Sequence, residues 1–133
     1  PNAKTFNLPN TICIPHLGAS TPESEVNCAI MAVNEIKEYL ENGNIINSVN
    51  YPECNMGVSN TIGRIAINHK NIPNMVGQIT SILAAAGVNI ADMINKSKKD
   101  WAYTLLDLEV EVSSETLTAL RNIEGVVKVR VVK

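Results

Sequence analysis

A histidine in the segment CIPHLGASTPESE, residues 13–25, could take part in proton transfer. His16 follows a short apolar stretch and precedes a candidate helix, so it lies in a loop of the kind that often carries functional residues. Imidazole titrates near neutral pH and can exchange a proton with a substrate oxygen. Gly18 and Ala19 are small enough for a ligand to approach the backbone. The alternative is a loop histidine with no chemical role.

A second group of polar residues lies in HKNIPNMVG, residues 69–77. His69 and Asn71 come where a predicted strand gives way to a predicted helix, and the free amides of a helix start can bind a carboxylate. The Asn71 side chain can both donate to and accept from a small zwitterion, and Asn89 adds a second amide. The alternative is that Asn71 and Asn74 cap the helix and that the histidine is solvated.

Composition excludes several classes of function. The 133 residues carry a net charge of −2 without a long basic run, which argues against nucleic acid or an anionic membrane as partner. Cys13, Cys28 and Cys54 form no C-x-x-C pair and only two histidines occur, so we predict neither a disulfide framework nor a metal site. No apolar run is long enough to span a bilayer and no signal-peptide pattern opens the chain, so we expect a cytoplasmic protein.

The first part of the chain predicts a short buried strand over NTICI, residues 10–14, and then a long helix over about 22–42. Pro22 suits the first helical turn, Gly43 suits the end, and apolar residues recur at helical spacing between them. This apolar stripe needs a surface to pack on. The Asn-rich residues 44–61 are typical of a linker. We therefore predict three regions: 1–52, a linker over 53–62, and a domain over 63–133.

Residues 63–132 show six segments in the order β-α-β-β-α-β, which predicts a ferredoxin-like α+β domain with two helices on one face of an antiparallel sheet. Its edge strands invite pairing with a second copy, so we expect a homo-oligomer. The six segments are GRIAINH (63–69), NIPNMVGQITSILAAAG (71–87), VNIADMIN (88–95), WAYTLLDLEVEV (101–112), SSETLTALRNIEG (113–125) and VVKVRVV (126–132).

Residues 7–52, with PNTICIPHLGASTPESEVNCAIMAVNEI and NGNIINSVNYP, resemble the C-terminal part of the catalytic region of D-isomer-specific 2-hydroxyacid dehydrogenases. The resemblance implies an α/β dehydrogenase fragment with a short strand, a long crossover helix and a linker. It implies that His16 is the general acid/base, and that His16, Leu17, Gly18 and Ala19 lie beside NAD. The family's G-x-G-x-x-G, substrate-binding Arg and carboxylate partner do not occur in these residues, so we expect this chain alone to bind no NAD and to be inactive.

Residues 63–132 resemble an ACT domain, a regulatory module of amino-acid metabolism. INHKNIPNMVG and GVNI are similar to the serine-binding version found in the D-3-phosphoglycerate dehydrogenase family. This implies that His69, Asn71, Asn89 and Ile90 bind the effector, and that two ACT sheets pair edge to edge with the effector between subunits. In one respect the sequence departs from the family, because Asn74 follows Pro73 where most ACT domains have Gly. That leaves the identity of the effector open.

The two resemblances occur in the order found in that family. They imply an enzyme that oxidises 3-phosphoglycerate with NAD in serine biosynthesis, with L-serine as the feedback effector that binds to the ACT domain. Two alternatives remain open. The ACT domain could serve mainly as a dimerisation scaffold, or the chain could be the tail of another 2-hydroxyacid dehydrogenase that senses a different amino acid.

Overall fold

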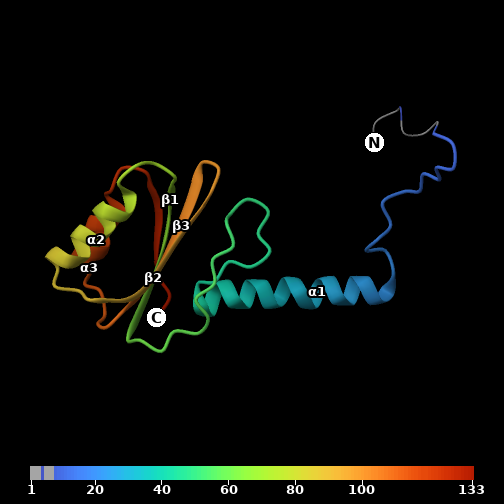
Figure 1. Ribbon diagram of the computed structural model, residues 1–133. Helices are drawn as coiled ribbons and strands as arrows, with labels where there is room; N and C mark the ends of the chain where they lie inside the picture. The colour runs from blue at the N-terminus through green and yellow to red at the C-terminus, as the bar shows by residue number, and fades with distance from the viewer. Residues whose placement is uncertain (1–3, 5–7) are drawn as a thin grey trace. The chain divides into compact units, whose positions relative to one another are not determined.

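A computed structural model describes residue 4 and residues 8–133. The chain forms two compact units, which divide between Val33 and Asn34. The first predicted region, 1–52, begins in residues outside the described part. Figure 1 shows the elements in chain order: α1 (Pro22–Lys37), η2 (Glu38–Asn42), β1 (Gly63–Lys70), α2 (Met75–Ala85), β2 (Ile90–Lys98), β3 (Trp101–Leu108), α3 (Ser114–Arg121) and β4 (Val126–Val131).

The long helix predicted over 22–42 is confirmed, with a wider final turn. Thr21 Oγ1 accepts a hydrogen bond from the Ser24 amide and so caps α1. The last five residues form the π-helical turn η2, and Gly43 ends it with φ of 75°. None of the residues of α1 is buried. Its apolar stripe is therefore exposed in the chain, and Ile36 near its end is 58% exposed.

The short buried strand predicted over residues 10–14 is wrong. These residues form no strand, and Ile12 and Ile14 are 88% and 76% exposed. A strand needs a neighbour for its backbone hydrogen bonds. None of the sheet pairings in the described part of the chain involves this segment, so its apolar residues alone do not make it a strand.

The predicted β-α-β-β-α-β domain is confirmed. Its four strands form one antiparallel sheet in the order β2-β3-β1-β4. Side chains alternate across a strand, so Ile65 and Ile67 of β1 face one side together with Leu106 and Leu108 of β3. They pack with residues of α2 and α3, such as Ile79, to form the main core. Both helices lie on this face in Figure 1.

The opposite face of the sheet is covered by the chain between η2 and β1. Ile45 and Cys54 exchange backbone hydrogen bonds of 2.8 and 3.0 Å, and both side chains are buried against Tyr103 and Leu105 of β3. The segment that its composition marks as a linker therefore packs on the sheet. We call this side of the sheet the open face, because neither α2 nor α3 covers it.

A buried ion pair holds this segment in place. Arg64 Nε lies 2.5 Å from Asp107 Oδ1, and the second guanidinium nitrogen completes a two-bond contact at 2.7 Å to Oδ2. The remaining nitrogen of Arg64 donates to the carbonyls of Asn42 and Gly57 at 2.9 and 2.6 Å. Burial by itself would raise the pKa of Asp107, but hydrogen bonds from Arg64 and Ser59 outweigh it, so its pKa lies below the ordinary value.

Candidate functional site

His69 lies at the end of β1 and its ring is buried in a chain of polar contacts. Nδ1 is 2.8 Å from the Lys70 carbonyl oxygen and Nε2 is 2.9 Å from Thr104 Oγ1, which lies 3.2 Å from Asn95 Oδ1. A carbonyl only accepts, so Nδ1 carries a proton. The single hydroxyl proton of Thr104 cannot serve both His69 and Asn95. Either the ring is an imidazolium, or the Asn95 amide turns its NH₂ group toward Thr104.

Asn71 is exposed and is bound to the turn between β2 and β3. Its backbone N–H donates to the Asp100 carbonyl at 2.8 Å, and its side-chain NH₂ group donates to the Lys99 carbonyl at 3.0 Å. The alternative in which Asn71 caps α2 is therefore wrong, because its side chain bonds to Lys99. Asn74 occupies the N-cap position of α2 but makes no capping hydrogen bond with its side chain. At this end of the sheet the structure thus brings His69 and Asn71 together.

Asn74 stands where the backbone is left-handed, with φ of 64°. Gly adopts this conformation without strain, and Asn is among the few other residues that tolerate it. Asn therefore fits the position at which the resemblance implies Gly. Its Oδ1 lies so close to Gly77 that a Cβ at that glycine would clash with it, so the Asn74 side chain occupies the space above the first turn of α2.

Asn89 and Ile90 lie at the opposite end of the sheet. Ile90 pairs with Leu108 of β3, whereas His69 pairs with Ala102, which in turn pairs with Ser97 of β2. Positions 90 and 97 are seven residues apart on one strand, or about 23 Å at the usual rise. No small molecule can reach both groups in a single chain. The four predicted effector residues therefore form two separate groups, and a site made of both would need a half-site from each of two chains.

The loop predicted to be catalytic is exposed throughout. His16, Leu17, Gly18 and Ala19 are all exposed, and no hydrogen bond or ion pair to the His16 ring forms among the described residues. Nothing lies within 4 Å of a Cβ placed on Gly18. This loop is therefore open to an approaching group.

Two residues in the series of polar contacts at His69 were not predicted from the sequence. Thr104 and Asn95 belong to different strands, and the sheet register brings Thr104 to His69 and Asn95 to Thr104. Their strand parity could have placed them on the same face as His69, but the sequence does not give the register. No group of three or more His, Cys, Asp or Glu residues in the described part of the chain could hold a metal ion.

No family model matches the chain. The curated D-3-phosphoglycerate dehydrogenase of Haemophilus influenzae is 30% identical to it over 122 residues, 92% of this chain and 30% of the relative. That of Escherichia coli strain K12 is 29% identical over 137 residues, 97% of this chain and 33% of the relative. The enzyme of Dictyostelium discoideum is 30% identical over 123 residues, 92% of this chain and 30% of the relative.

This chain is similar in sequence to D-3-phosphoglycerate dehydrogenases. The similarity extends over nearly the whole chain, which spans about a third of the length of these curated relatives. The predicted resemblance to the D-3-phosphoglycerate dehydrogenase family is thereby confirmed.

Similar solved structures include the ACT domain from GTP pyrophosphokinase of Chlorobium tepidum, with a TM-score of 0.48, 21% identity, and coverage of 55% of this chain and 99% of that one. The regulatory subunit of aspartate kinase from Thermus thermophilus gives a TM-score of 0.44 and 15% identity over 52% of this chain and 48% of that one. The ferredoxin-like fold of this chain rests on its own strand order. Among the described residues, no helix is long and apolar enough to cross a membrane.

Proposed function

We propose that this chain is the C-terminal regulatory part of a D-3-phosphoglycerate dehydrogenase, and that it binds L-serine between two copies of the βαββαβ domain. The whole enzyme would oxidise 3-phosphoglycerate with NAD in the cytoplasm. The homology supports the enzyme class. The observation that carries the regulatory role is the division of the predicted effector residues between two distant ends of one sheet.

A second copy can bring the two half-sites together. Strand β2 forms an edge of the sheet, and most of its residues are exposed. Antiparallel pairing of two β2 strands about a two-fold axis would set the start of one strand against the end of the other. Asn89 and Ile90 of one copy would then lie beside the turn of the other, to which Asn71 is bonded.

The chemistry of this combined site suits a small amino acid. The amides of Asn71 and Asn89 offer both donors and acceptors, which can pair with the carboxylate and the ammonium group of a zwitterion. His69 lies at the same end as Asn71 but already uses both ring nitrogens within the chain. We assign it the positioning of the end of β1, and direct contact with serine would require its bond to the Lys70 carbonyl to break.

In the whole enzyme, His16 would exchange the proton of the substrate hydroxyl, and Leu17, Gly18 and Ala19 would lie beside NAD. NAD would accept the hydride in that reaction. The described residues do not fit NAD by themselves, since the open loop at Gly18 is not joined by any phosphate-binding turn or acid/base partner. Dehydrogenase turnover by the 133-residue chain alone would contradict this assignment.

The decisive test is calorimetric titration with L-serine of the wild type, Asn71→Ala, Asn89→Ala and, as a matched control, Asn122→Ala at the exposed C-terminal end of α3. The first two variants should each lose binding and the control should keep it. A site shared between copies predicts complementation. Mixing the two defective variants should restore roughly a quarter of the sites, because half of the dimers are mixed and each has one intact site.

Each other outcome has a clear meaning. Loss of binding in both variants without complementation would contradict a shared site. A dimer that gives no heat with serine or any other amino acid would favour the scaffold. A dimer that binds another amino acid but not serine would favour the tail of a different 2-hydroxyacid dehydrogenase.

A further inference from the structure

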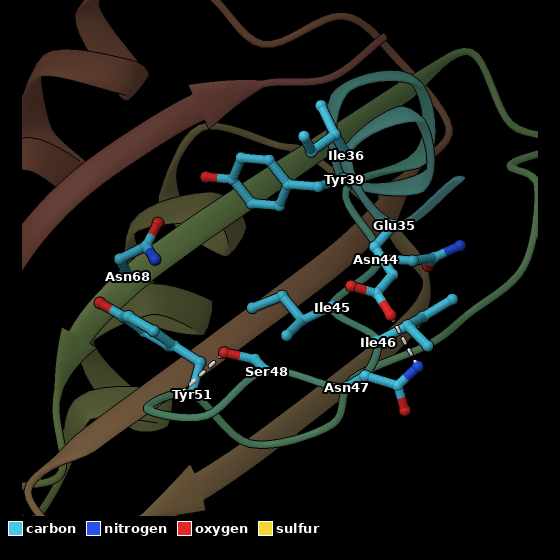
Figure 2. Close-up of a pocket in the computed structure, with 10 residues that line it drawn as sticks. All are labelled: Glu35, Ile36, Tyr39, Asn44, Ile45, Ile46, Asn47, Ser48, Tyr51 and Asn68. Atoms are coloured by element: carbon cyan, nitrogen blue, oxygen red, sulfur yellow. Dashed lines mark hydrogen bonds between the residues drawn. The ribbon is translucent and has the colours of Figure 1, made fainter. Parts of the chain in front are cut away.

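A pocket of about 340 Å³ lies on the open face of the sheet, within the unit Asn34–Lys133. Figure 2 shows its lining residues, which come from the end of the long helix, from the segment after Gly43, and from β1. Its volume lies within the range of about 300–1,000 Å³ that is common for small-molecule sites. Apolar and aromatic side chains make most of its wall: Ile36, Tyr39, Ile45, Ile46 and Tyr51.

Asn68 places a polar group in this largely apolar wall. It lies on β1 with the parity of Ala66, so its side chain faces the open side of the sheet, away from the His69 ring. The residue is 9% exposed, and its Oδ1 atom has no hydrogen-bond partner among the described residues. Buried side-chain oxygens almost always have a partner, because the lost hydration is otherwise uncompensated.

The amide side chains of Asn44 and Asn47 do not supply this partner. Asn44 already donates to Glu38 and Gly57 and accepts from the Met56 amide. The Asn47 side chain donates to Glu35 at 2.8 Å. These side-chain amides of the pocket are thus engaged elsewhere. Arg130 Nε is the other buried atom without a partner in the described part of the chain, and it is not part of the pocket wall.

The wall around Asn68 is held in place before any ligand arrives. The Arg130 guanidinium lies over the Tyr39 ring, 4.4 Å from its centroid, and donates to the carbonyls of Tyr39 and Leu40. Tyr51 packs edge-on against Tyr103 at 6.4 Å between ring centroids. A formed wall costs little ordering on binding, which favours a ligand site over a collapsed gap.

We propose that this pocket binds a small neutral molecule that joins an apolar or aromatic group to a primary amide or a similar N–H donor. The apolar group would lie against Tyr39, Ile45 and Tyr51, and the N–H group would donate to Asn68 Oδ1. The NH₂ group of Asn68 could return a hydrogen bond to the carbonyl of the same ligand. Glu35 at the wall disfavours an anion. This site is separate from the zwitterion site proposed at the β2 edge.

The test uses two probes of nearly equal shape, benzamide and acetophenone. Both present a phenyl ring and a carbonyl, but acetophenone has a methyl group where benzamide has its NH₂ group. Titrations followed by ¹H–¹⁵N NMR report on the backbone and on the Asn68 side-chain amide directly. We expect benzamide to bind about tenfold more tightly than acetophenone, which is the usual value of one buried hydrogen bond. Benzoate should bind more weakly than benzamide.

Two variants make the result specific. Asn68→Leu keeps the size of the side chain and should abolish the preference for benzamide over acetophenone, whereas Asn122→Ala should leave it unchanged. If Asn68→Leu does not fold, Tyr51→Leu serves instead and should weaken both probes while the preference persists. Failure of both probes to shift signals at millimolar concentration, or equal affinities in the wild type, would overturn the proposal. Serine titration should be the same in Asn68→Leu and wild type, which keeps this test independent of the effector site.

Discussion

The ion pair between Arg64 and Asp107 offers a sharp test of how the segment after η2 is held on the sheet. We choose Asp107→Asn, because it removes the charge and keeps the shape. The variant leaves the Arg64 guanidinium, which is fully buried, without its counter-charge. Arg64 would keep the carbonyls of Asn42 and Gly57 and one acceptor on the new amide. It would lose the second of its two contacts with residue 107.

Breaking a buried ion pair costs about 3–5 kcal/mol, because one charge stays buried without compensation. The retained acceptors place Asp107→Asn near the lower end, at about 3 kcal/mol. Replacement of both partners, Arg64→Met with Asp107→Leu, removes the isolated charge. The double variant should therefore be less destabilised than the sum of Arg64→Met and Asp107→Leu measured singly, with a coupling energy of at least about 2 kcal/mol.

Urea unfolding can be followed by the fluorescence of Trp101, the single tryptophan. Hydrogen exchange at the Ile45 and Cys54 amides adds a local measurement, because these residues bond to each other across the segment that Arg64 anchors. Asp107→Asn should speed their exchange more than that of amides in α3. A loss of stability below about 0.5 kcal/mol would place the pair among ordinary surface ion pairs and refute this account.

The pH dependence follows from the lowered pKa of Asp107. A carboxyl group whose pKa is depressed by folding stabilises the native state above its unfolded pKa, about 3.9 for Asp, and this contribution is lost as the pH falls through the folded pKa. The difference in unfolding free energy between wild type and Asp107→Asn should therefore be constant near neutral pH. It should shrink as the pH falls below about 4.

Three further predictions concern single residues. Gly43→Ala should destabilise the protein by about 1–3 kcal/mol in urea unfolding, because φ is 75° and the new Cβ would lie 2.8 Å from Leu105 Cδ1. Asn74→Gly should change stability by less than about 1 kcal/mol, since φ is 64° there and Gly tolerates it; a larger loss would show that the Asn74 side chain has a structural role. Iodoacetamide should label Cys13 and Cys28, which are exposed, well before Cys54, whose burial raises its pKa to about 11. Mass spectrometry of the labelled peptides measures the order, and early labelling of Cys54 would mean that the segment opens readily.

The sequence predicts the elements well where the hydrophobic period is long and ends at a Gly or Pro. The helix over 22–42 and the two helical segments of the βαββαβ domain, 71–87 and 113–125, are of this kind. The four strands are predicted by their alternation, although β3 ends at Leu108 and not at residue 112. Prediction from sequence fails for residues 10–14, because an apolar composition does not supply the neighbouring strand that a buried strand requires. It also gives no sign that the Asn-rich segment 44–61 packs on the sheet.

The reason for that second failure lies in the polar residues of β1 and β3. Arg64, Asn68 and Asp107 alternate with apolar residues, and such alternation usually indicates a face in water. In this sheet the polar face is buried, because backbone carbonyls at Asn42 and Gly57 bond Arg64 from outside the sheet. Those carbonyls carry no sequence signal, so alternation alone could not distinguish a solvated face from a covered one.

The same limit explains why the sequence predicts the effector residues but not the pocket at Asn68. His69, Asn71, Asn89 and Ile90 are found by resemblance, yet their division between two ends of the sheet follows only from the strand register. Asn68 is the neighbour of His69 in the chain but faces the other side of the sheet, and its importance depends on a partner that its Oδ1 atom lacks among the described residues. One residue step along β1 thus separates the two proposed sites, which differ in chemistry: the edge proposed to bind a zwitterion between copies, and the apolar wall that contains the buried Asn68 Oδ1 atom.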